Sequence, residues 1–461
     1  MKKITFILTL MLILSIMGPS SVMAQTSTGS SQAPGTWVSS INIQNTGSGD
    51  ASVTLVFYDS TGATKLTFDV LPVIPAGGSR SLYVPSEMSI LANNQYSVVA
   101  SSNQPLEVVV NSSSTFPATA GSYAGVKSTE TSTTLYFPGL YKGYYTFDSE
   151  IVLQNTTSSP ASITINFYNQ NTGAEITAAK IIKSVPANSS TVFPLASNSN
   201  LPSGSTGLFS AKVTSDQALA GVVNIWSPTK YGEYASYNGF ISGSTSLIFT
   251  PALYKNYYNF VSSLTIQNLG SLAAEIKLTY SNGTIETKTL QPLQAFQYYQ
   301  PNNGNLPSGN TSGVFSAKIE SLNGQPIVAL VNVEDKIKGS LASYNGPSTA
   351  TNSVNCPVVL KSFYQWFSAQ TVQNVGSSST NITITYSDGK TKTFNNVPSN
   401  GTVNIIELNS AGSVLNDLSS LSATITSSGQ PIVAVVQENS NDRYNSTPGD
   451  YLLSYTCVPK P

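Results

Sequence analysis

The stretch KNYYNFVSSLTIQN (255–268) places a cluster of aromatic residues directly before a run in which polar and apolar residues alternate. The same pattern recurs without a gap as KGYYTFDSEIVLQN (142–155) and KSFYQWFSAQTVQN (361–374), and in shortened form as GTWVSSINIQN (35–45). Strict alternation is typical of a β-strand with one buried face. The chain therefore repeats a β-rich unit.

Two further markers follow each copy in the same order. The first is NQPLEVVV (103–110), DQALAGVV (216–223), GQPIVALV (324–331) and GQPIVAVV (429–436), and the second is SYAG, SYNG, SYNG and SYTC, starting at 122, 236, 343 and 454. Repeats at a fixed order and separation indicate tandem units. We therefore predict four units, at 36–132, 133–245, 246–351 and 352–461, after a polar linker at 25–35.

The third unit shows the expected strand pattern most clearly. AEIKLTY (274–280) and TIETKTL (284–290) flank an Asn-Gly pair, which is a strong hairpin signal because a type I′ turn needs positive φ at both central residues. Roughly seven short strands in about 105 residues are typical of an immunoglobulin-like β-sandwich. A β-propeller is the main competitor, but its blades repeat every 40–50 residues or so. We predict an all-β chain of four such sandwiches in an elongated array.

Residues 1–24 have the layout of a secretory signal peptide. MKK is followed by the apolar run ITFILTLMLILSIM and by small residues that end at Ala24. The apolar run is shorter than the roughly 20 residues that span a bilayer. We expect an exported protein, secreted or associated with the cell surface, whose mature chain has no membrane span.

Composition excludes several functions. Only 9% of the residues are charged, the net charge is −1 and histidine is absent. A chain without a basic stripe is a poor partner for nucleic acid, and one without histidine lacks Ser–His–Asp catalysis and imidazole metal ligands. We predict no cofactor, no metal site and no enzymatic activity. A surface of hydroxyls and amides also predicts that folding depends little on pH or salt.

The aromatic residues of the opening motif fall into two groups. One large ring begins the alternating run of every unit, on the face predicted to be buried, and we interpret these rings as core anchors: Trp37, Phe147, Phe260 and Trp366. The aromatic pairs before them are Tyr144 and Tyr145, Tyr257 and Tyr258, and Phe363 and Tyr364, and unit one has none. These pairs are either packing residues at the joints between units or an exposed platform that stacks on sugar rings.

The two cysteines of the chain, Cys356 and Cys457, lie in the first and last predicted strands of unit four. In an exported protein such a pair predicts a disulfide. Lys142, Lys255 and Lys361 recur at the end of the first strand of units two to four, and we interpret them as solvated strand ends.

The pattern LYK, YYxF, QN, Asn/Asp-Gly, GQPIVAVV and SYNG resembles the tandem immunoglobulin-like repeats of secreted and surface proteins from filamentous bacteria of the Chloroflexus type. This resemblance implies a sandwich fold and an extracellular location. It favours a structural or adhesive surface protein that self-associates or binds other surface proteins, in a sheath, coat or filament. The alternative is a carbohydrate-binding protein that holds polysaccharide on its tyrosines.

Unit one departs from the pattern because it lacks the first strand, LYFPGLYK in unit two. Either it folds with fewer strands, or its open edge accepts a strand from another molecule. The tail QTSTGSSQAPG (25–35) is too polar to be an attractive donor.

Overall fold

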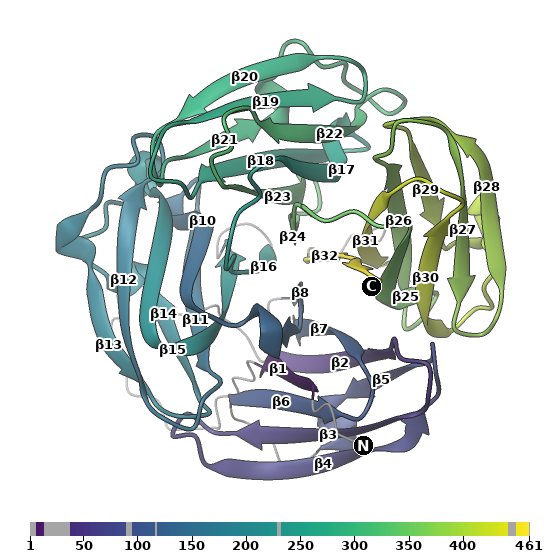
Figure 1. The fold of residues 1–461 in the computed structure, drawn as a ribbon, viewed down its shortest axis with the longest axis horizontal. Coiled ribbons are helices and arrows are strands. Elements are labelled where there is room, and N and C mark those ends of the chain that lie inside the picture. Colours follow the sequence, from purple (N-terminus) through teal and green to yellow (C-terminus); the bar gives the residue numbers. More distant parts are fainter. Residues whose placement is uncertain are drawn as a thin grey trace.

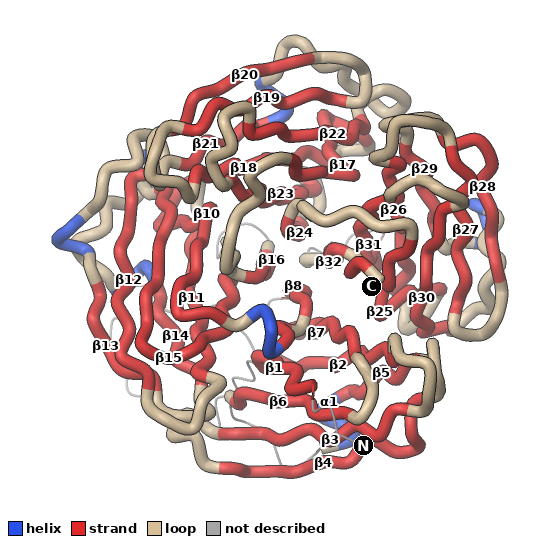
Figure 2. Tube along the Cα trace, viewed as in Figure 1, coloured by secondary structure: helices blue, strands red, loops and turns tan. Residues whose placement is uncertain are grey.

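The computed structural model describes residues 6–12, 37–88, 95–115, 118–227, 232–440 and 449–460. Nearly all regular structure in these ranges is antiparallel β-sheet (Figure 2), and the only α-helix is the single turn α1 (Val84–Glu87). No helix in the described ranges is long and apolar enough to cross a membrane. The chain is therefore all-β, as predicted.

The sheets form sandwiches, each with an outer sheet at the periphery and an inner sheet nearer the middle of the molecule (Figure 1). In unit one the outer order is β4 (Thr64–Ile74), β3 (Ala51–Tyr58), β6 (Tyr96–Ser102), β1 (Phe6–Leu12) and β9 (Val126–Lys127), and the inner order is β5 (Ser79–Tyr83), β2 (Trp37–Asn45), β7 (Leu106–Thr115) and β8 (Ala118–Ala124). In unit four the outer order is β28 (Thr391–Val397), β27 (Thr380–Tyr386), β30 (Ser419–Ser427), β25 (Ser353–Lys361) and β33 (Val458–Pro459), and the inner order is β29 (Thr402–Ile406), β26 (Trp366–Asn374), β31 (Ile432–Ser440) and β32 (Leu452–Thr456).

Units two and three have the same plan with their two sheets joined. The outer strands of unit two are β13 (Ile181–Val185), β12 (Ala161–Asn169), the first half of β15 (Leu208–Trp226) and β10 (Ser132–Tyr144), and the inner strands are β14 (Ser190–Pro194), β11 (Phe147–Asn155), the second half of β15 and β16 (Tyr234–Asn238). Unit three has β20 (Ile285–Leu290), β19 (Ala274–Tyr280), β22 (Val314–Ser321) and β17 (Leu247–Tyr257) outside, and β21 (Ala295–Tyr299), β18 (Phe260–Asn268), β23 (Ile327–Asp335) and β24 (Ser340–Asn345) inside.

The asparagine of each QN marker holds one end of its sandwich together. Asn268 is fully buried, and its Nδ2 donates to the carbonyls of Leu272 (2.7 Å) and Leu290 (3.0 Å). Its Oδ1 accepts the backbone N–H of Gly270 at 2.8 Å. Asn45, Asn155 and Asn374 make the corresponding bonds. The marker therefore recurs because one buried amide satisfies backbone groups where the chain leaves the inner sheet.

The units do not form the elongated array that we expected. Figure 1 shows them around a common centre, where the last inner strands β8, β16, β24 and β32 meet, and we call these the central strands. β8 contacts both β16 and β32, and β24 contacts both β16 and β32. Unit four therefore touches unit one, and the ring closes.

Side-chain hydrogen bonds link the central strands at all four joints. Asn238 Nδ2 donates to Ala124 O at 2.7 Å, and Asn345 Nδ2 donates to Asn238 O at 2.8 Å. Thr456 Oγ1 donates to Asn345 O at 2.6 Å. Between units four and one, Ser122 Oγ donates to Ser454 O at 2.8 Å. The residue after Ser-Tyr in the marker therefore faces a neighbouring unit.

The inner sheets are buried on both faces, which explains the closure. In β23, Ala329 and Val331 face the core of unit three, whereas Leu330 packs into the core of unit two. The equivalent residues also pack into the core of a neighbouring unit. Val222 of unit two packs into unit one, Val435 of unit four packs into unit three, and Val109 of unit one packs into unit four. A strand buried on both faces reads as a continuous apolar run, and this is why the marker GQPIVALV does not alternate.

Candidate binding groove

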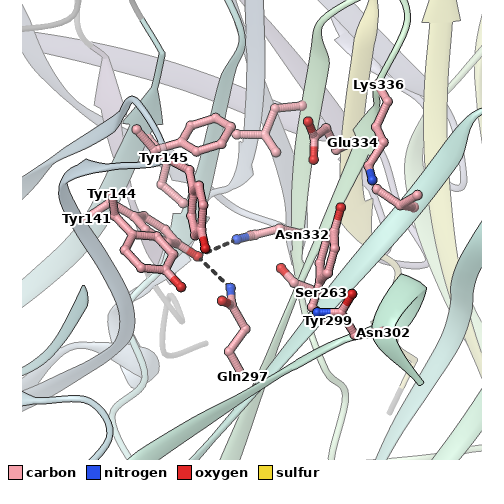
Figure 3. Close-up of a pocket in the computed structure, with 14 residues that line it drawn as sticks. Tyr141, Tyr144, Tyr145, Ser263, Gln297, Tyr299, Asn302, Asn332, Glu334 and Lys336 are labelled. Atoms are coloured by element: carbon pink, nitrogen blue, oxygen red, sulfur yellow. Dashed lines mark hydrogen bonds between the residues drawn. The ribbon is translucent and has the colours of Figure 1, made fainter. Parts of the chain in front are cut away.

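A groove of about 500 Å³ lies at the joint between units two and three (Figure 3). Unit two contributes the end of β10 and the start of β11, and unit three contributes residues of β18, β21 and β23 together with the chain after them. Its lining includes Tyr141, Tyr144, Tyr145, Phe147, Ser263, Gln297, Tyr299, Asn302, Asn332, Glu334 and Lys336. A concave site that joins aromatic faces to a few polar groups is typical of a small-ligand site.

One wall of the groove is the tip of the β10–β11 hairpin. Tyr144 pairs with Phe147, and the two residues between them, Tyr145 and Thr146, have φ of 48° and 79°. Positive φ at both turn residues is the type I′ geometry, which normally selects Asn or Gly. Tyr145 is 72% exposed and packs edge-to-face against Tyr144, with ring centroids 4.7 Å apart. An exposed tyrosine in this backbone conformation is a feature that function often explains.

The hairpin recurs in units three and four. Tyr258 and Tyr364 have φ of 45° and 48° and are 56% and 82% exposed. Each packs edge-to-face against the aromatic residue before it, Tyr257 at 4.9 Å and Phe363 at 4.8 Å. The aromatic cluster of the opening motif thus forms a two-residue turn that presents a tyrosine at its tip.

Tyr141 links the two units beneath the groove. Its hydroxyl accepts hydrogen bonds from Asn332 Nδ2 at 2.9 Å and Gln297 Nε2 at 3.2 Å, both from unit three (Figure 3). Ser343 of the SYNG marker donates to Asn332 Oδ1 at 2.7 Å and so orients the amide. Burial raises the pKa of the Tyr141 hydroxyl well above its ordinary value, so this group stays protonated.

The opposite wall belongs to unit three and is more polar. Tyr299 and Asn302 lie there, and the ammonium group of Lys336 lies 5.1 Å from the centroid of the Tyr299 ring. Glu334 lines the same end of the groove. Together the walls offer aromatic faces, amide donors and acceptors, and one charge of each sign.

This chemistry suits a neutral, hydroxyl-rich ligand. The pyranose ring has apolar C–H faces that pack on tyrosine, and hydroxyls that pair with amides and carboxylates. Most glycoside hydrolases use a pair of carboxylates across a cleft, and the lining of the described groove includes one carboxylate, Glu334. Among the described residues no group of three or more His, Cys, Asp or Glu side chains could hold a metal ion.

The residues predicted as core anchors lie at the ends of the cores. Phe147, Phe260 and Trp366 are half-buried and pack against the core of their own unit, beside the hairpin tip. Trp37 is fully buried, but its partners are Trp226 and Tyr234 of unit two, with the Tyr234 ring centroid 4.4 Å away. Trp37 therefore packs at the joint between units one and two.

Each aromatic pair combines a half-buried residue with an exposed one, and the pair of unit two also lines the groove at the joint with unit three. Tyr144, Tyr257 and Phe363 are half-buried beside the core, whereas the tyrosines after them project outward. Sequence reasoning missed Tyr141, Gln297, Asn302 and Asn332, because nothing in the chain shows that unit three lies against this face of unit two. Tyr recurs at 141 and 254 in the LYK triplet, and Tyr254 Oη donates to Gln437 Oε1 of unit four at 2.6 Å. The recurrence of this tyrosine in the LYK triplet could have indicated that it contacts the next unit.

The recurring lysines are not solvated strand ends. Lys255 and Lys361 are 8% and 3% exposed. Lys255 Nζ donates to the carbonyls of Asn303 (2.5 Å) and Leu306 (2.8 Å), and Lys142 Nζ donates to those of Asn198 (2.7 Å) and Leu201 (2.9 Å). Lys361 Nζ donates to Leu415 O at 2.5 Å. Each ammonium group therefore holds the loop that precedes the outer strand paired with its own strand, which is β15, β22 or β30.

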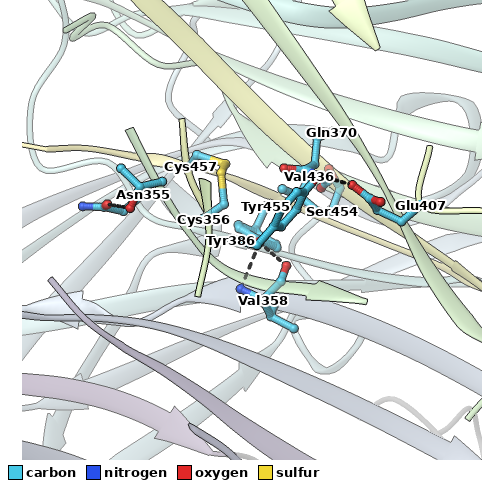
Figure 4. The surroundings of a disulfide bond; sticks show 11 residues. Asn355, Cys356, Val358, Gln370, Tyr386, Glu407, Val436, Ser454, Tyr455 and Cys457 are labelled. Carbon is cyan, nitrogen blue, oxygen red and sulfur yellow. Dashed lines mark hydrogen bonds between the residues drawn. A yellow bond between two sulfur atoms is a disulfide. The ribbon is translucent and has the colours of Figure 1, made fainter. Parts of the chain in front are cut away.

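The predicted disulfide between Cys356 and Cys457 is present, with Cα atoms 4.7 Å apart (Figure 4). It joins β25 to the residue after β32 and thus crosses from the outer to the inner sheet of unit four. Beside it the hydroxyl of Tyr455 donates to Val358 O at 2.5 Å and accepts from Val358 N at 3.2 Å.

No protein-family model matches the chain, and the comparison with curated proteins found no match. Among solved structures, Thermotoga maritima 1070 is 15% identical over 24% of this chain and 93% of its own, with a TM-score of 0.21. The pilus backbone RrgB from Streptococcus pneumoniae is 6% identical over 77% of this chain and 86% of its own, with a TM-score of 0.13. At such TM-scores neither similarity carries an argument about this chain.

Proposed function

We propose that this chain is an exported, non-enzymatic structural or adhesive protein of the cell surface, in which four repeated immunoglobulin-like sandwiches form one closed ring after a signal peptide is removed. The observation that supports this best is the closure of the central strands. Four joints combine buried apolar residues with hydrogen bonds, so the ring is a rigid module suited to a sheath, coat or filament.

The test combines localisation with imaging. Antibodies against the chain should label intact producing cells, and the mature protein released from them should begin near Gln25 by mass spectrometry. Electron microscopy of the purified protein should show compact rings, alone or in ordered assemblies. A chain found only in the cytoplasm with residues 1–24 intact would refute the proposal.

The second candidate is a carbohydrate-binding surface protein, and the groove between units two and three favours it. Its tyrosines and amides suit a polysaccharide segment, with Tyr145 as the exposed stacking ring. Burying one such aromatic face contributes about 1–2 kcal/mol, so Tyr145→Ala should weaken binding roughly tenfold.

The measurement is retention of the mature protein on cell-wall and extracellular polysaccharides, with competition by free oligosaccharides. Tyr83→Ala is the matched control, because Tyr83 is 49% exposed and lies in unit one, away from the groove. Binding that survives Tyr145→Ala and Tyr299→Ala together, or that falls equally in Tyr83→Ala, excludes the groove as the sugar site.

A further inference from the structure

The first strand of each sandwich occupies the same position in units two to four. β10, β17 and β25 pair antiparallel with β15, β22 and β30 in the outer sheets. Their side chains complete the cores, for example Phe137 and Leu140 in unit two and Ile248 and Leu253 in unit three. A sandwich without this strand would leave an open sheet edge above its core.

In unit one that position is occupied by the segment predicted to be removed on export. β1 (Phe6–Leu12) pairs antiparallel with β6, with Phe6 opposite Ser102 and Leu12 opposite Tyr96. It also pairs with β9, as β25 pairs with β33 in unit four. Cleavage after Ala24 would remove β1 and expose the edges of β6 and β9.

The first strand of units two to four also contains a bulge that binds a buried tyrosine hydroxyl. In units two to four the tyrosine of the last marker bonds to a bulge in the first strand, where proline precedes the bonded residue. Tyr237 Oη donates to Gly139 O at 2.9 Å and accepts from Gly139 N at 3.3 Å. Tyr344 bonds in the same way to Ala252, at 2.6 and 3.3 Å.

Tyr123 is the counterpart in unit one, and it is only 5% exposed. Its hydroxyl has no hydrogen-bond partner among the described residues. Buried hydroxyls are nearly always paired, because an unpaired one loses its hydration without compensation. β1 pairs with β6 in an unbroken register, without the bulge that Tyr123 would bind, and cleavage would leave this edge without a strand as well.

We propose that, in the exported protein, the edge of β6 in unit one is a docking site for a β-strand of a different protein. This proposal rests on the export proposed above. The donor strand should carry apolar residues that enter the core, and a proline followed by a residue whose N–H and C=O reach Tyr123. The chain's own strands with this pattern, LYFPGLY (135–141), IFTPALY (248–254) and VNCPVVL (354–360), are built into its units, so a second copy has none of them to spare.

The experiment uses the mature protein purified after export, with its N-terminus determined by mass spectrometry. The probe is a fluorescent peptide with the sequence of residues 132–144, STTLYFPGLYKGY. We expect saturable binding, a higher melting temperature, and slower hydrogen exchange at the amides of Tyr96–Ser102. A peptide of the same composition with the apolar and polar positions exchanged is the control and should not bind.

Tyr123→Phe tests the hydroxyl. It should lower the affinity for the peptide roughly 3- to 10-fold, the value of one or two neutral hydrogen bonds, and should not lower the melting temperature of the free protein. Tyr344→Phe, which removes bonds already made in unit three, should lower the melting temperature and leave peptide affinity unchanged.

The outcomes separate this proposal from the export proposal. A cleaved, exported protein that binds neither peptide, with β6 amides as protected as those of β22 and β30, would overturn the docking site and leave the surface function intact. An exported protein that retains residues 6–12 would also overturn it, because the edge is then filled by its own chain. An uncleaved cytoplasmic chain would overturn both proposals.

Discussion

Leu330→Ala tests the closure of the ring most directly. Leu330 has no exposed surface, although it points away from the core of its own sandwich. It packs into unit two, where a Cβ added to Gly139 would lie 2.8 Å from Leu330 Cδ2. In an elongated array this residue would lie on an exposed sheet face.

The two arrangements predict different costs. Truncation of a fully buried leucine removes about 2–5 kcal/mol of stability, because apolar contacts are lost and a cavity remains. Truncation of an exposed leucine changes stability by about 0.5 kcal/mol or less. We therefore expect a loss of about 3 kcal/mol for Leu330→Ala and almost none for Leu272→Ala, a control residue of unit three that is 65% exposed.

Calorimetry and urea unfolding of the mature variants measure this difference. With an unfolding entropy of about 2.1 cal/mol/K per residue, a ring of roughly 430 residues that melts as one unit should lose about 3 °C for 3 kcal/mol, whereas a unit of about 110 residues that melts alone should lose about 13 °C. The size of the shift therefore reports the cooperativity of the ring. Equal stability of the Leu330→Ala and Leu272→Ala variants would refute the joint between units two and three.

Three further predictions follow from the same structure. Small-angle scattering of the mature protein should give a radius of gyration of about 22 Å, as for a compact chain of this length, and a value near the roughly 40 Å of four units end to end would contradict the ring. Burial raises the pKa of Glu438 to about 8 from 4.5, so the folded state holds a proton that the unfolded chain releases. Stability should fall as pH rises from about 5 to 8, by up to about 1.4 kcal/mol per pH unit, and Glu438→Gln should reduce this slope; an identical slope in wild type and variant in urea titrations would contradict the assignment. Replacement of Cys356 and Cys457 together by Ser opens a loop spanning 101 positions and should cost about 2–4 kcal/mol, whereas unchanged unfolding midpoints would exclude a stabilising role.

This expected pH dependence differs from the weak dependence expected from composition alone. A surface of hydroxyls and amides titrates little, but the few carboxyls include buried ones. Glu438 accepts a hydrogen bond from Asn111 Nδ2 at 2.8 Å across the joint between units four and one. Burial likewise raises the pKa of Glu107 to about 7, despite its ion pair with Lys127 at 2.6 Å. Composition counts such groups and does not reveal their burial.

Local features of the fold could be predicted from the sequence because each depends on a few neighbouring residues. Alternation predicted the strands, and Asn282-Gly283 predicted the hairpin between β19 and β20. The predicted type I′ turn was wrong, because Gly283 has a positive φ (87°) and Asn282 does not, and Gly283 N bonds to Tyr280 O at 2.9 Å. The cysteine pair predicted the disulfide, because the two residues occupied the first and last strands of one unit. In each case the deciding interaction lies within a single unit.

The arrangement of the units was decided only by the tertiary structure. Val109, Val222, Leu330 and Val435 look like ordinary core residues in the sequence, yet each fills a neighbouring sandwich. The groove depends on the same fact, since Tyr141 and Asn332 are 191 positions apart and meet because two units join. A strand's apolar pattern shows that both faces are buried but not what covers the second face. That depends on the shape of the partner surface, which no local pattern encodes.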